Sequence, residues 1–135
     1  MLNVISELSR EEIVRLINEK KEMFIYKQFE DNRCMYMSKV AIEINGVRFR
    51  IEAYLNDSNV RRVTLVAVGV QSNVLYKNYD TDNIHRKWLK QNYGEPTESF
   101  ISGVKYVLPN MVISSEHDPR SGSNRIFISY KDVNN

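Results

Sequence analysis

The chain has 135 residues, of which 42% are hydrophobic, 27% charged and 10% aromatic, a composition typical of globular proteins and not of disordered ones. Its 19 lysines and arginines against 17 aspartates and glutamates leave a net charge of +2, too balanced to demand a polyanionic partner. The single cysteine, Cys34, cannot form an intramolecular disulfide, and its apolar neighbours predict a buried structural thiol. No charged-then-apolar stretch with a small-residue cleavage site is recognisable near the first residues, and no apolar run approaches the ~20 residues that a spanning helix needs, so we expect neither a secretory leader nor a spanning helix. We therefore expect one cytoplasmic domain over residues 1–135.

The first predicted element is an amphipathic helix from about Glu11 to Glu22. Ser9 and Glu12 have the spacing of a capping box. An apolar stripe at helical spacing follows, which can extend to Phe24. The next residues, 23–37, are apolar enough for a helix extension or a strand. We expect a short strand or loop there, and then a strand that begins near Met35.

The stretch Val40–Ala53 predicts a β-hairpin, because two alternating runs flank Asn45-Gly46, a dipeptide that suits a two-residue type I′ turn. In that register one face of the hairpin is apolar, whereas the other pairs Glu43 with Arg48 and Lys39 with Glu52. The predicted apolar face consists of Val40, Ile42, Ile44, Val47, Phe49 and Ile51.

Five more elements are predicted along the rest of the chain. The β-branched run Val60–Val70 predicts a central strand. A helix should begin at Asp80 or Thr81 and end at Gly94. Strands are then expected at 104–108, and at 111–113 paired with 126–128 across a loop over 116–124. These elements predict an α+β fold, a single antiparallel sheet of about 5–6 strands with two helices packed on one face.

The second half resembles small single-domain bacterial proteins, many of them uncharacterised and some of them toxin-immunity proteins. The resemblance rests on a helix that ends in Tyr-Gly-x-Pro and on a closing strand with alternating aliphatic residues and a tyrosine. The matching residues are Trp88, Leu89, Tyr93, Gly94, Pro96, Ile126, Ile128 and Tyr130. The resemblance implies a non-catalytic binder and brings no catalytic residues.

Catalytic and metal-binding motifs are scarce in this sequence. Only two histidines occur, and His85, His117 and Asp82 could contribute to a mixed oxygen and nitrogen metal site. Helix capping explains Asp82 equally well, and no metal-binding motif of recognised spacing is present. We therefore predict no metal, no other cofactor and no catalytic residues, although a hydrolase or metal-dependent enzyme remains a third hypothesis.

Two groups of residues are candidate binding sites. On the polar face of the sheet lie Arg48, Arg50, Tyr54 and Arg62, which could contact a protein or form a platform for phosphates and stacked bases. In the loop before the last strand, an anion could bind the backbone amides between two arginines. The loop residues are Arg120, Ser121, Ser123 and Arg125.

We therefore expect a non-catalytic protein-binding module, an immunity or inhibitor protein in particular. The alternative is a nucleic-acid-binding domain that uses the basic sheet face. Neither hypothesis involves a membrane or an obligatory small molecule.

Overall fold

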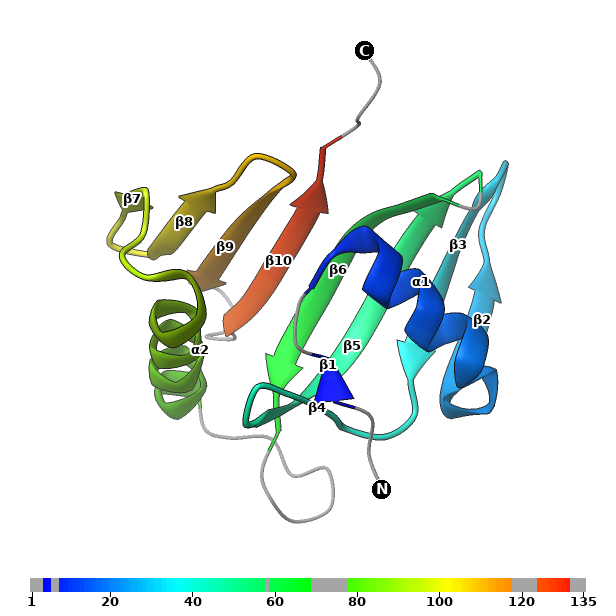
Figure 1. Cartoon of the computed structure of the whole chain (residues 1–135), viewed down its shortest axis with the longest axis horizontal. Helices are drawn as coiled ribbons and strands as arrows, with labels where there is room; N and C mark the ends of the chain where they lie inside the picture. The colour runs from blue at the N-terminus through cyan, green and yellow to red at the C-terminus, as the bar shows by residue number, and fades with distance from the viewer. Residues whose placement is uncertain (1–3, 6–7, 58, 69–77, 118–123, 132–135) are drawn as a thin grey trace.

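A computed structural model describes residues 4–5, 8–57, 59–68, 78–117 and 124–131. The fold is α+β, and these residues form two α-helices and one mostly antiparallel sheet (Figure 1). The helices are α1 (Arg10–Glu19) and α2 (Asn78–Tyr93). The strands are β1 (Val4–Ile5), β2 (Phe24–Gln28), β3 (Arg33–Ser38), β4 (Ile42–Ile44), β5 (Val47–Asn56), β6 (Asn59–Ala67), β7 (Glu98–Ser99), β8 (Gly103–Val107), β9 (Met111–His117) and β10 (Asn124–Tyr130).

Within the described residues the sheet has ten strands, so the predicted number of about five or six is wrong. The main path runs β1-β4-β5-β6-β10-β9-β8-β7, and β3 pairs with β5 on the same side as β4. Two of the additional strands arise because the strand expected to begin near Met35 and enter the hairpin is divided into β3 and β4, and because the stretch expected as a short strand or loop forms β2. Two more, β1 and β7, are only two residues long and have too few positions for a recognisable alternation.

The hairpin β4–β5 has the predicted turn and register. Asn45 and Gly46 both have positive φ, 47° and 91°, and Ile44 pairs with Val47 and Ile42 with Phe49. The prediction is wrong beyond Ile42, because the chain leaves the ladder between β3 and β4. Val40 is consequently exposed.

Near the break between β3 and β4, a side chain on β3 accepts a backbone hydrogen bond from β5 that a backbone carbonyl would accept in a regular ladder. The buried hydroxyl of Ser38 accepts a hydrogen bond of 2.9 Å from the backbone N–H of Ile51. Because β3 ends there, Glu52 lies opposite Met37 and not opposite Lys39 as expected.

Helix α1 begins as the sequence predicts, since the Ser9 side chain accepts a hydrogen bond from the Glu12 backbone N–H. It ends at Glu19, earlier than expected, and a 3₁₀ turn (Lys21–Met23) leads into β2. Helix α2 begins a little before the predicted residues and ends before Gly94, whose φ of 81° is the expected left-handed cap.

Both helices contribute to one core that covers a single face of the sheet. Ile13, Leu16 and Ile17 of α1 and Trp88 and Leu89 of α2 belong to the same buried cluster. The sheet side chains of that cluster alternate along the strands, and include Ile42, Ile44, Phe49, Ile51, Ala53, Val63, Leu65, Ile113, Ile126 and Ile128. The side chains between them point to the opposite face, which we call the outer face.

Candidate functional site

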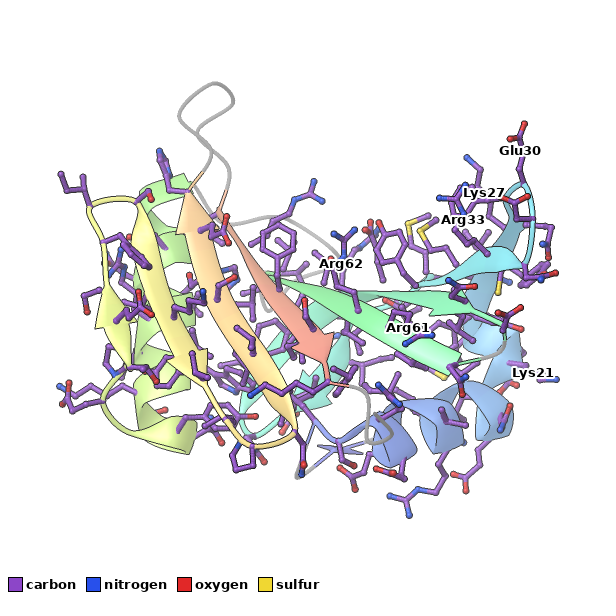
Figure 2. The ribbon with its side chains drawn as sticks, turned by 90° about the horizontal axis from the view of Figure 1, so that it is seen from above. Lys21, Lys27, Glu30, Arg33, Arg61 and Arg62 are labelled. Carbon is purple, nitrogen blue, oxygen red and sulfur yellow. The ribbon has the colours of Figure 1, made fainter. Side chains whose placement is uncertain are left out.

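The outer face is formed at its centre by three neighbouring strands, β5, β6 and β10. Alternation and register place polar and charged side chains along it, together with a few apolar ones. The outer-face residues of these strands are Arg48, Arg50, Glu52, Tyr54, Arg62, Thr64, Val66, Arg125, Phe127 and Ser129. In Figure 2 the Arg62 side chain lies on the side of the sheet away from α1. The four residues predicted for the sheet face are therefore all on this face, and so is Arg125 of the predicted loop site.

Arg62 lies between two aromatic rings that come from the strands on either side of it. Its guanidinium carbon is 4.6 Å from the ring centroid of Tyr54 on β5 and 5.9 Å from that of Phe127 on β10. Cation–π attraction at such distances holds the guanidinium group over the rings and limits its rotamers. We call Tyr54, Arg62 and Phe127 the arginine–aromatic cluster.

The hydroxyl group of Tyr54 is also held, because it donates a hydrogen bond of 2.8 Å to Glu52. Burial raises the pKa of Tyr54, and the adjacent carboxylate of Glu52 raises it further. The phenol therefore remains protonated at neutral pH and acts as a hydrogen-bond donor and not as a base.

Arg48 and Arg50 occupy the other end of β5 and do not join the cluster. Their Nε atoms are shielded from solvent, and both side chains are half-buried. Arg48 lies opposite Glu43 in the ladder, as the sequence predicted. The four predicted residues thus divide into Tyr54 and Arg62, which contact each other, and Arg48 and Arg50, which lie apart from them; of the four, Arg62 is the exposed one.

Sequence analysis did not select Phe127, although a signal was available. Phe127 stands between two isoleucines that the predicted closing hairpin buries, so alternation alone puts its ring on the outer face. What the sequence does not contain is the pairing of β10 with β6, which brings Phe127 to Arg62.

Of the four residues predicted for the loop site, Arg125 is the one that the structure describes. Arg120, Ser121 and Ser123 lie outside the described residues. Arg125 belongs to β10, where its exposed side chain lies opposite Glu116 of β9.

The two histidines of the metal hypothesis lie in different environments. The buried His85 uses both ring nitrogens, since Nε2 accepts from the Ala67 N–H at 3.0 Å and Nδ1 lies 2.6 Å from Asn124 Oδ1. His117, in contrast, is exposed at the end of β9. Within the described ranges, no group of three or more histidine, cysteine, aspartate or glutamate side chains is placed to hold a metal ion.

A pocket of about 490 Å³ opens beside Tyr54, where β3, β5 and β6 lie next to the β2–β3 turn. Sequence analysis did not predict it, because its walls come from two stretches of the chain, residues 29–34 and 54–61, that only strand pairing brings together. Its lining residues are Phe29, Glu30, Arg33, Cys34, Tyr54, Leu55, Asn56 and Arg61. Cys34 is half-buried in this wall, and so is less enclosed than a core thiol.

Neither helix of the described chain is long and apolar enough to cross a membrane. A scan against protein-family models and searches of curated proteins and of solved structures found no match to this chain.

Proposed function

We propose that this protein is a non-catalytic protein-binding module, an immunity or inhibitor protein, that contacts its partner through the outer face. The observation that carries the proposal is the position of Arg62 between Tyr54 and Phe127 on a face that the helices leave open. The cytoplasm is the proposed compartment.

Pre-organisation supports the arginine–aromatic cluster as the centre of the contact. Arginine and tyrosine are enriched among the residues that dominate binding energy, and an arginine already held by rings loses less rotamer entropy on binding. The exposed guanidinium still has N–H groups that can donate to a carboxylate. We therefore propose a partner with an acidic surface.

Affinity measurements on single variants test this proposal. The chain captures its partner from an extract of the source cells, and the purified pair is then titrated with wild-type protein, Arg62→Ala and Tyr54→Leu. Truncation of a hot-spot residue costs about 2 kcal/mol or more, so each variant should bind at least about tenfold more weakly.

The matched control is Arg15→Ala, which removes an exposed arginine from α1 on the opposite side of the sheet. Its affinity should remain within a factor of about two of the wild type, as for residues outside an interface. Equal losses in Arg15→Ala and Arg62→Ala would exclude the outer face as the contact surface, and turnover of a substrate by the pure chain would contradict the whole proposal.

Nucleic-acid binding is the second candidate, favoured by a group of cations at one end of the sheet. Figure 2 labels Lys27 and Arg33 beside the β2–β3 turn, and Arg61 and Arg62 on β6, with Glu30 as the one labelled acid. A stacking platform fits less well, because one face of the Tyr54 ring is already next to Arg62. Association with RNA or DNA that weakens steeply with salt, and that Arg62→Ala reduces, would favour this candidate over a protein partner.

A further inference from the structure

The pocket beside Tyr54 has a different chemistry from the outer face of the sheet. Its volume of about 490 Å³ falls within the range of about 300–1,000 Å³ typical of small-molecule sites. Phe29, Tyr54 and Leu55 give it apolar and aromatic walls, whereas its cations are Arg33 and Arg61. Glu30 is its single carboxylate, so the charged lining residues sum to one positive charge.

A β-bulge explains how Arg61 comes to line the pocket. Tyr54 pairs with Arg62 and Leu55 pairs with Val60, so that Arg61 is an extra residue on β6 opposite no residue of β5. Bulges change the direction of a side chain and occur next to functional sites. An arginine from β6 thereby lines the same pocket as Arg33 of β3, although β5 separates the two strands.

The ion pair that Arg33 makes leaves room for a ligand anion. Arg33 is 3.9 Å from Asp31, a long ion pair between two well-exposed side chains that contributes little and can open. The Lys27 ammonium lies 5.5 Å from the centroid of the Phe29 ring and balances the Asp31 carboxylate beside Arg33, so that the net charge around the pocket remains +1.

We propose that this pocket binds a small organic monoanion with a flat apolar body, whose carboxylate interacts with Arg33 and Arg61 while its ring lies against Phe29, Tyr54 and Leu55. One positive charge selects a single anionic group, and the aromatic walls select a ring in preference to an inorganic ion. This site does not depend on the proposed function, since Arg62 and Phe127 are not among its lining residues.

Calorimetric titration with three probes tests the proposal. 2-Naphthoate carries both the ring and the carboxylate, naphthalene-2-methanol has the ring without the charge, and acetate has the charge without the ring. We expect a Kd of about 1 mM or tighter for 2-naphthoate and at least about tenfold weaker binding of the other two. Equal affinities for 2-naphthoate and naphthalene-2-methanol would overturn the role of the arginines.

Variants of the two arginines locate the ligand. Arg33→Ala and Arg61→Ala should each weaken 2-naphthoate binding about tenfold, the loss expected for one charge-assisted hydrogen bond. Arg125→Ala, which removes an exposed arginine elsewhere on the outer face, serves as the control and should leave the affinity unchanged. An unchanged affinity in both pocket variants would overturn the proposal.

The only cysteine of the chain supplies an independent readout, because Cys34 lies in the pocket wall. Saturating 2-naphthoate should slow the alkylation of Cys34 by the neutral reagent iodoacetamide severalfold, as followed by mass spectrometry. Acetate at the same concentration should not slow it. An alkylation rate that 2-naphthoate leaves unchanged would place the ligand elsewhere and overturn the proposal, whether or not a protein partner binds through Arg62.

Discussion

The Nδ1 atom of His85 on α2 lies 2.6 Å from the amide oxygen of Asn124 on β10, with both side chains buried. Since Nε2 accepts a hydrogen bond from the Ala67 N–H, the proton of the neutral ring is on Nδ1, which therefore donates to Asn124. Asn124 Oδ1 also accepts from the Ser115 hydroxyl, and Asn124 Nδ2 donates to Asp82 Oδ1 at 3.0 Å. One amide thus joins α2 to β9 and β10.

Replacement of Asn124 should therefore destabilise the fold. Asn124→Ala leaves the His85 N–H and one hydroxyl without their acceptor in a buried site, and we expect a loss of about 2–4 kcal/mol in the free energy of unfolding. Urea denaturation followed by circular dichroism measures the loss. The control is Ser129→Ala, which changes an exposed side chain further along the same strand, β10. It should alter stability by less than about 0.5 kcal/mol.

The buried imidazole also makes stability depend on pH. Burial lowers the pKa of His85 from 6.5 to about 4, and the hydrogen bond to Asn124 and the charge of Asp82 only partly oppose this effect. Between these two pH values the unfolded chain binds a proton that the folded chain does not, so stability falls as the pH decreases from 6.5 to 4. The full loss is about 3 kcal/mol, because one pKa unit corresponds to about 1.4 kcal/mol.

A comparison with His85→Gln isolates this effect from the titration of the carboxylates. Urea denaturation at pH 7.5 and at pH 4.5 gives the change in unfolding free energy for each protein. The wild type should lose about 2–3 kcal/mol more than the variant over this interval. Parallel losses in the two proteins would show that His85 does not titrate as its burial requires.

Two glycines should differ in their sensitivity to alanine. A Cβ atom at Gly103 would lie 1.8 Å from the carbonyl oxygen of Ser115, so β8 could not remain paired with β9 at this position. We expect Gly103→Ala to cost about 3 kcal/mol or more. At Gly46 a Cβ atom meets open space and only the positive φ is strained, with an expected cost of about 1–2 kcal/mol. Thermal denaturation of the two variants measures the difference, and the reverse order would contradict the close approach of β8 to β9.

Trp88 connects α2 to the central hairpin. Its Nε1 atom donates a hydrogen bond of 2.9 Å to the Ile44 carbonyl, and its ring contacts Phe49 edge to face at 5.0 Å between centroids. Trp88→Phe removes this bond and leaves a cavity, so we expect a loss of about 2 kcal/mol or more in unfolding free energy.

Tyr106→Phe is the matched control for that change. It removes one hydrogen bond, from the Tyr106 hydroxyl to the Gly94 carbonyl at 2.8 Å, but leaves the ring in place. Its expected cost is about 1 kcal/mol. If both variants lost the same amount in urea denaturation, the packing of Trp88 on the hairpin would contribute nothing measurable.

Local patterns determined the elements whose formation depends on neighbours in the sequence. Asn45-Gly46 determined the turn and the first part of the hairpin register, because few residues other than glycine and asparagine accept positive φ. Ser9 determined the start of α1, and Gly94 the end of α2, through bonds and dihedral angles within a few residues. Hydrophobic alternation likewise placed Tyr54 and Arg62 on the polar face.

Only the tertiary structure decided which of these local elements meet. The insertion of β10 between β6 and β9 brings Phe127 to Arg62, two residues far apart in the sequence, and no periodic pattern specifies strand order. Tertiary structure also decided the additional strands, the bulge that places Arg61 in the pocket wall, and the burial of His85. Each of these features depends on a hydrogen bond or a contact between distant segments. Such a contact stabilises the protein only once the whole sheet has formed.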